Sequence, residues 1–124
     1  MIRGTTAQFK FKLPYPVEEL KWATIRFWQP GNMNPSLPIT RILKDCSAPA
    51  DPTELYVSLD ADDTMKFSEK HKAKVQLRAR HESGTVFGSR TKLVTVYPMY
   101  EEDPNLPAEN EEGWVILDGE TVVG

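Results

Sequence analysis

Short runs in which apolar and polar residues alternate constrain the fold of this chain most strongly. In the run AQFKFKL, Phe9, Phe11 and Leu13 fall on one face, and Lys10 and Lys12 fall on the other. Alternation with period two is typical of a strand with one buried face. The 124 residues also include ten prolines, which disfavour long helices because proline lacks an amide donor and clashes inside a helix. The sequence therefore predicts short strands rather than helices.

Similar runs recur at intervals of about 8–15 residues, with turn residues between them. They predict an all-β fold, an immunoglobulin-like antiparallel β-sandwich of about seven strands with an extended C-terminal tail that ends in a β-hairpin. Alternation assigns nine side chains to one core: Phe9, Phe11, Ile25, Phe27, Leu55, Val57, Leu59, Val75 and Leu77.

The acidic run DADDTMKF follows the strand that ends at Leu59. Asp60 is suited to cap a short helical turn, with Asp62 and Asp63 in its first turn, where the helix dipole favours negative charge. Met65 and Phe67 are then expected to fold inward, in a corner that crosses between the two sheets. A calcium loop would need a central glycine and a distal glutamate, and this run has no glycine. We expect a capped corner and no metal site.

Charge divides the chain unevenly. Residues 1–100 hold all fifteen Lys and Arg and ten acids, a net charge of +5, whereas residues 101–124 hold eight acids and no base. We expect a β-sandwich domain over 1–100, an acidic, proline-containing linker over 101–113, and a docking segment over 114–124. An acidic tail on a basic body suggests contact with the body of the same or a neighbouring copy, although a solvated tail that aids solubility is the alternative.

Asp118-Gly119 between apolar flanks predicts a two-residue hairpin near the C-terminus. A lone hairpin is marginally stable in water, so its apolar side chains need a surface to cover. The hairpin either folds back on its own sandwich or adds strands to another subunit, and we expect the second. The tail residues assigned to partner binding are Trp114, Ile116, Val122 and Val123.

Trp22 and Trp28 fall on the polar face of the run KWATIRFW. Large aromatic side chains there indicate either a second packing layer or contact with a partner, and we expect the partner. A basic stripe (Lys72, Lys74, Arg78 and Arg80) lies on the outer face of another expected strand. It could meet phosphates, or it could keep an edge strand from pairing with other chains. Aromatic residues do not interleave with this stripe in the sequence, so nucleic-acid binding is not expected.

No catalytic or nucleotide-binding motif is present, and we expect no enzyme, no cofactor and no metal. His71 and His81 lie among charged residues, which indicates solvated side chains. The lone Cys46 cannot form an intrachain disulfide and fits a reducing compartment, with no catalytic role expected. No apolar run reaches the length of a membrane span, and the N-terminal residues do not form a signal segment, so neither membrane insertion nor export is expected.

A series of landmarks runs along residues 3–97: RGTT, FKFKLP, KWATIRFWQ, LKDC, SLDADDTMKF and AKVQLRAR followed by a Ser-Gly turn. The series resembles small uncharacterised proteins encoded among the virion genes of tailed phages and prophages of gut Firmicutes. The resemblance implies an immunoglobulin-like structural or accessory protein of a virion. The tail beyond residue 100 departs from the short ending of those proteins.

We therefore expect a non-enzymatic virion protein, a capsid, neck or tail component that binds other particle subunits. It would assemble in the cytoplasm of the bacterial host, with other virion proteins as its partners and a homo-oligomer as a second option. Alternatives are a phage-encoded inhibitor that binds a host protein, and a carbohydrate- or nucleic-acid-binding domain.

Overall fold

The computed structural model describes residues 1–48, 51–98, 114–117 and 121–123, and strands dominate it. The strands are β1 (Ala7–Lys12), β2 (Leu20–Trp28), β3 (Ile39–Ile42), β4 (Glu54–Leu59), β5 (Ala73–His81), β6 (Val86–Ser89), β7 (Lys92–Val94), β8 (Trp114–Leu117) and β9 (Thr121–Val123). One helix, α1 (Ala61–Met65), and two short 3-10 turns, η1 (Val17–Glu19) and η2 (Leu43–Asp45), complete the described elements. The expectation of a mostly β chain is confirmed.

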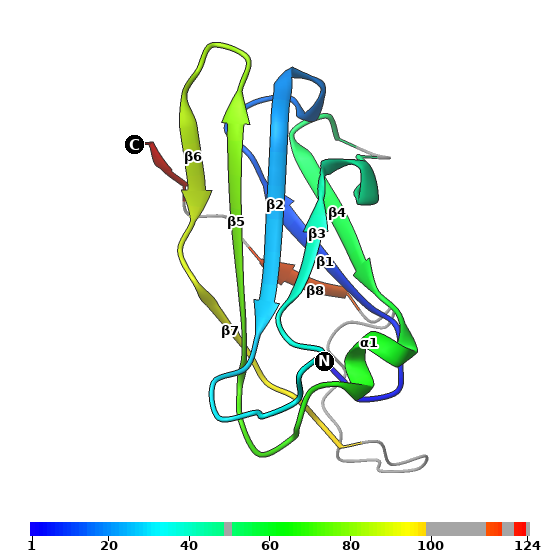
Figure 1. Ribbon diagram of the computed structural model, residues 1–124. Helices are drawn as coiled ribbons and strands as arrows, with labels where there is room; N and C mark the ends of the chain where they lie inside the picture. The colour runs from blue at the N-terminus through cyan, green and yellow to red at the C-terminus, as the bar shows by residue number, and fades with distance from the viewer. Residues whose placement is uncertain (49–50, 99–113, 118–120, 124) are drawn as a thin grey trace.

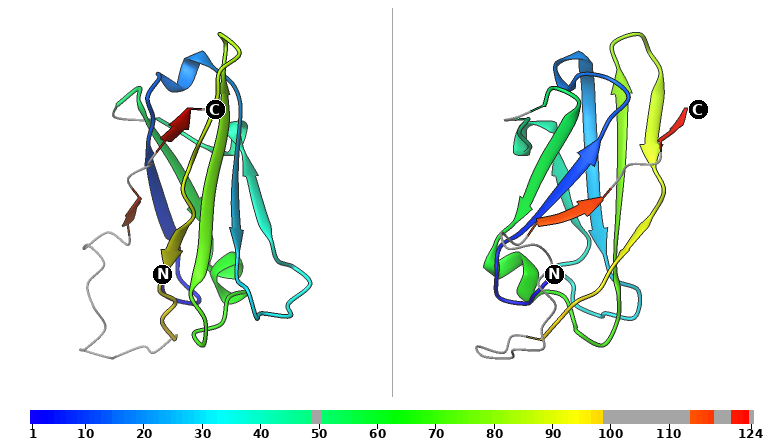
Figure 2. Two further views of the ribbon diagram at one scale, coloured as in Figure 1. Left: turned by 90° about the vertical axis from the view of Figure 1, so that its left-hand side faces the viewer. Right: turned by 180° about the vertical axis from the view of Figure 1, so that it is seen from behind.

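Strands β1–β7 form two antiparallel sheets that face each other (Figure 1). The small sheet pairs β4 with β1, and the large sheet has the order β3-β2-β5-β6. The long strand β5 pairs with β6 over one part of its length and with β7 over another. The left view of Figure 2 shows the two layers from the side.

The core lies between the two sheets. Phe9 of β1 and Phe27 of β2 meet across it, with 4.9 Å between their ring centroids. All nine side chains that alternation assigned to the core are buried, which confirms that assignment. Burial of each large apolar side chain stabilises the fold by about 1.5–3 kcal/mol, so this shared interior holds the two sheets together.

Helix α1 forms the corner between β4 in the small sheet and β5 in the large one. The amide of Asp63 donates to Asp60 Oδ1 at 2.8 Å, and the amide of Asp60 donates to Asp63 Oδ2 at 3.1 Å. This reciprocal capping box satisfies two amides that the first turn of a helix leaves free. The predicted capped corner is confirmed.

Asp63 also ties the corner to the large sheet. Its Oδ2 accepts from Arg41 of β3 at 2.6 Å, and its Oδ1 accepts from Lys66 at 3.4 Å. Burial raises the pKa of Asp63, but the hydrogen bond from the Asp60 amide and the Arg41 guanidinium outweigh it, so the pKa lies below its ordinary value.

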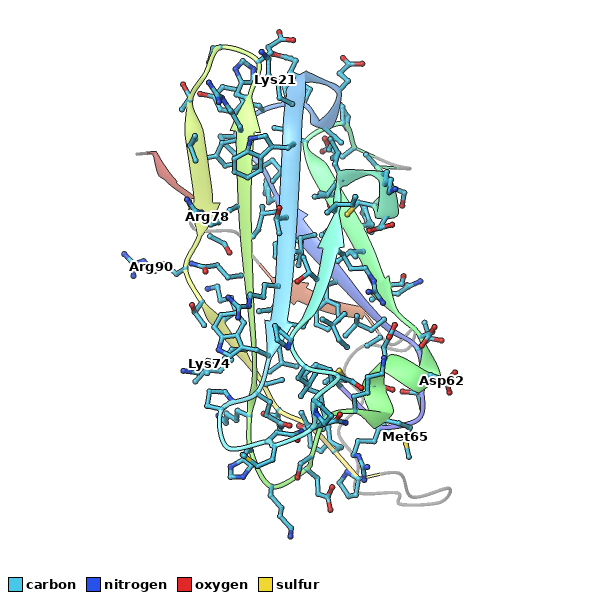
Figure 3. All side chains as sticks on the ribbon, in the orientation of Figure 1. Lys21, Asp62, Met65, Lys74, Arg78 and Arg90 are labelled. Atoms are coloured by element: carbon cyan, nitrogen blue, oxygen red, sulfur yellow. The ribbon has the colours of Figure 1, made fainter. Side chains whose placement is uncertain are left out.

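The side chains that follow Asp63 divide between the interior and the surface. Phe67 is 1% exposed, as predicted, but Met65 is 40% exposed and points away from the sheets (Figure 3), so its predicted burial is wrong. Thr64 takes the inward position instead: its Oγ1 donates to the Thr5 carbonyl at 2.7 Å and accepts from the Gly4 amide at 3.0 Å. A single helical turn aims residues only a few positions apart in different directions, so strand-like alternation does not apply to it.

The C-terminal strands do not form the predicted hairpin. Strand β8 pairs in parallel with β1, β9 pairs antiparallel with β6, and the two therefore lie in different sheets. The edges of β1 and β6 present unpaired backbone groups, and one strand added to each satisfies both edges, whereas a lone hairpin satisfies neither. The Asp118-Gly119 turn and the expected linker over 101–113 lie outside the described residues.

Within the described part of the chain, no helix has the length and apolar character that crossing a lipid bilayer requires.

Truncation of the core residue Leu77 to alanine is expected to lower the free energy of unfolding by about 2–5 kcal/mol, because Leu77 is fully buried and its removal leaves a cavity. Leu93→Ala is the matched control, because Leu93 is 57% exposed, and it should change stability by no more than about 0.5 kcal/mol. Urea denaturation of both variants measures this, and equal losses would contradict the assignment of the faces.

Replacement of Asp63 by asparagine is expected to lower stability at neutral pH by about 1–3 kcal/mol, because a charged hydrogen-bond acceptor is lost. The folded pKa of Asp63 is depressed, so its stabilisation is present above the unfolded pKa of about 3.9 and is lost as the pH falls through the folded pKa. The difference between wild type and Asp63→Asn should therefore shrink in acid.

Denaturant titrations at several pH values between 7 and 2.5 measure that difference. The matched control is Asp62→Asn, because Asp62 lies in the same turn but is exposed. A difference for Asp63→Asn that stays constant down to pH 2.5 would contradict the role of its charge.

Candidate functional site

The outer face of β2 carries two tryptophans. Alternation turns Ile25 and Phe27 into the core and leaves Trp22, Arg26 and Trp28 on the opposite face. Trp22 is 38% exposed and Trp28 is half-buried. The structure thus places both tryptophans on the outer surface of the large sheet, as the sequence predicted.

The neighbouring strand β5 brings cations beside these tryptophans. In the register of the two strands, Trp22 lies opposite Arg80 and Trp28 lies opposite Lys74. Figure 3 shows Lys74 and Arg78 on β5. We call the following set the basic–aromatic face: Trp22, Arg26, Trp28, Lys74, Arg78 and Arg80.

Sequence reasoning missed this arrangement. Along β5 alone, no aromatic residue interleaves with the cations, and the expectation that the basic stripe lacks aromatic partners is wrong. The aromatic residues come from β2, about fifty positions earlier in the chain, and only the β2–β5 register places them beside the cations. The alternation of KWATIRFW and AKVQLRAR was the available signal, because it showed that each run has a polar outer face.

A shallow groove of about 480 Å³ crosses the basic–aromatic face. Its lining comes from both strands: Trp22, Thr24, Arg26, Gln76 and Arg78. The Trp22 indole offers flat apolar surface, while the guanidinium, amide and hydroxyl groups offer hydrogen bonds. This combination is suited to bind an extended chain that carries negative charge and apolar groups.

The charge of this face is not neutralised within the described structure. Neither β2 nor β5 contains an acidic residue, and no ion pair among the described residues involves Arg26, Lys74, Arg78 or Arg80. Arg26 instead lies over the Trp28 ring, with Cζ 5.7 Å from the ring centroid, in a cation–π contact. The face therefore presents positive charge to a partner.

The tail residues assigned to partner binding do not join this face. Trp114 and Ile116 belong to β8 of the small sheet, and Val122 and Val123 belong to β9, beside β6. The structure describes the strand pairing of these four residues but not their side chains. The structure thus divides the six predicted partner-binding residues between three places.

A second polar cluster surrounds His81, which is 8% exposed, so the expected solvated side chain is wrong. Tyr15 stacks on the imidazole at 3.9 Å between centroids, and the two ring nitrogens lie 2.8 Å from Ser83 Oγ and 2.9 Å from Glu19 Oε1. Glu82 brings a second carboxylate near these groups. Both ring nitrogens already have partners within the protein, and these contacts account for the burial of the ring.

Cys46 lies beside η2, where its Sγ is 3.4 Å from the Ile42 carbonyl oxygen. Burial and the neighbouring Asp45 carboxylate raise the pKa of this thiol to about 11. A thiol with so high a pKa is protonated at neutral pH and is a weak nucleophile. The environment of Cys46 therefore favours a structural role.

Comparison of the chain with protein-family models, curated proteins and solved structures gave no match.

Cys46 is expected to react with a disulfide reagent at pH 8 about a hundredfold more slowly in the folded protein than after denaturation, because its pKa of about 11 leaves little thiolate. Absorbance of the released thiolate measures the rate, and the rate in the folded protein should rise steeply between pH 8 and pH 10. Free cysteine is the control. Equal rates for folded and denatured protein would contradict a raised pKa.

Proposed function

We propose that this chain is a non-enzymatic structural or accessory protein of a tailed-phage virion, which binds other particle subunits through the basic–aromatic face. The observation that carries the proposal is this face, where the exposed Trp22 and the half-buried Trp28 lie beside cations that no described acid neutralises. Tryptophan and arginine are enriched where protein interfaces are strongest. A surface of this composition is typical of a contact site.

The arrangement of strands supports the immunoglobulin-like assignment. In immunoglobulin domains one sheet pairs strands B and E, and the facing sheet contains C, F and G, with C′ beside C in variable-type domains. Here β1 and β4 take the places of B and E, and the order β3-β2-β5-β6 takes the places of C′, C, F and G. Helix α1 then occupies the E–F corner between the two sheets.

Contacts between the landmarks support the resemblance to virion-module proteins. The RGTT segment packs on the helix of the SLDADDTMKF segment: the Gly4 amide and the Thr5 carbonyl both bind Thr64 Oγ1, and Arg3 donates to the Met65 carbonyl at 3.3 Å. Two landmarks almost sixty positions apart are thus parts of one structural unit. Their joint presence supports a shared domain architecture, from which the virion role is inferred.

The polar clusters favour binding over catalysis. Asp63 is engaged in a capping box and an ion pair, both ring nitrogens of His81 have protein partners, and the thiol of Cys46 is protonated at neutral pH. Each of these groups is used to hold the fold. The proposal places assembly in the cytoplasm of the bacterial host, where capsid, neck or tail subunits would be the partners.

The test is detection of the protein in particles from a strain that carries its coding sequence. After density-gradient purification, the protein should follow the particle peak at a constant ratio to the other subunits by quantitative mass spectrometry. Double replacement Trp22→Ser, Trp28→Ser should lower that ratio by roughly tenfold, because interface tryptophans carry much of the binding free energy.

Met33→Ser is the matched control, because Met33 is 92% exposed and lies in the β2–β3 loop, away from the basic–aromatic face. It should leave the ratio unchanged. If the wild-type protein remains entirely in the soluble fraction while particles are abundant, the proposed function is wrong.

A further inference from the structure

We propose that the basic–aromatic face binds the acidic segment 101–112 of a second copy of this chain. The inference deepens the proposed function, because it rests on the same contact face and names its partner. It depends neither on the phage assignment nor on any other subunit.

The first argument is charge. The face presents four cations, and no described acid pairs with them: Arg26, Lys74, Arg78 and Arg80. Segment 101–112, EEDPNLPAENEE, holds six acids and no base. The chain thus carries both a basic surface and an acidic segment, and the two are complementary in charge.

The second argument is spacing. The acids of the segment form two groups, Glu101–Asp103 and Glu109–Glu112, separated by PNLPA. Asp103 and Glu109 are six positions apart, which is about 20 Å in an extended chain. On the face, Arg80 and Lys74 are also six positions apart along β5. An extended segment laid along β5 would therefore place one acidic group at each end of the face.

The third argument is the apolar centre of the segment. Pro104, Leu106 and Pro107 lie between the two acidic groups. Proline-rich extended peptides bind aromatic-lined grooves, where their rings lie flat against indoles. Trp22 lines the groove beside Arg80 and Trp28 lies beside Lys74, so the two indoles flank the apolar stretch of the segment at the ends of the face.

Chain length points to a second copy. The residues on either side of the segment contact the N-terminal part of the chain: Tyr97 bridges to Ile2, and Trp114 pairs with Gln8 in the small sheet. On the C-terminal side, only Gly113 lies between the last acid of the segment, Glu112, and Trp114. The two steps from Glu112 to Trp114 span at most about 7 Å.

From Trp114, which pairs in the small sheet, a passage to the outer side of the chain's own large sheet must cross the sheet spacing of about 10 Å. The roughly 7 Å between Glu112 and Trp114 does not cover this distance. The face of a neighbouring copy has no such restriction. A contact between different surfaces of two copies repeats head to tail, so it generates a ring or an open filament.

The test uses the purified full-length chain, with sedimentation velocity over a concentration series in 50 mM and 500 mM salt. We expect self-association in 50 mM salt that weakens at least tenfold in 500 mM salt, because exposed charges are screened. The face variant (Arg78→Glu, Arg80→Glu) and the segment variant (Glu101→Lys, Glu102→Lys) should each associate at least tenfold more weakly than wild type. The first removes the net positive charge of the face, and the second lowers the net charge of segment 101–112 from −6 to −2.

An equal mixture of the two variants should associate again, because each variant offers the charge that the other has lost. The matched control for the face variant is Lys44→Glu, Lys70→Glu, which lowers the net charge by the same amount at exposed residues outside the face. It should associate like wild type. Thermal unfolding of every variant verifies that the fold is intact.

Two outcomes overturn the inference: a wild-type chain that is folded and monomeric at every concentration in 50 mM salt, or variants that do not associate when mixed. A twelve-residue oligothymidine tests the alternative occupant. If it quenches the tryptophan fluorescence of a monomeric wild type but not that of the face variant, the face is assigned to single-stranded nucleic acid instead. Presence in particles without self-association would contradict this inference alone, and self-association without presence in particles would contradict only the proposed function.

Discussion

The arrangement of the two sheets depends on their shared apolar core, and the buried carboxylate of Asp63 fixes the corner that connects them. It accepts hydrogen bonds from the Asp60 amide and from Arg41 of β3, and so joins the start of α1 to the edge of the large sheet. The next residue, Thr64, binds the backbone of the N-terminal segment. One helical turn thus holds three parts of the chain. A buried charge of this kind is costly unless it is fully paired, which makes the corner specific as well as stable.

The basic–aromatic face follows from the same corner. Because α1 carries the chain from the small sheet to the large one, β5 enters the large sheet beside β2 rather than pairing with β4. The resulting register sets Trp22 opposite Arg80 and Trp28 opposite Lys74. The core on one side of these strands and the contact face on the other are therefore produced by a single pairing, and a shift of one residue would exchange them.

Sequence reasoning succeeded where one local rule decides the outcome. Alternation identified all nine core side chains, and capping chemistry identified the helical turn at Asp60. It failed where a distant segment decides. Burial of His81 depends on Tyr15 and Glu19, which belong to the β1–β2 connection. The Asp118-Gly119 signal is purely local, whereas distant strands decide that β8 pairs with β1 and β9 with β6, in different sheets.

The sequence by itself determined that the chain is mostly β, the inward and outward faces of β1, β2, β4 and β5, and the capped corner, because these follow from period-two alternation and from hydrogen bonds over three residues. Only the tertiary structure decided which strands are neighbours, because pairing depends on how the buried faces of distant segments fit together. That choice placed the tryptophans of β2 beside the cations of β5. The residues of the contact face are therefore present in two separate runs of the sequence, KWATIRFW and AKVQLRAR. They form one surface only because folding pairs β2 with β5.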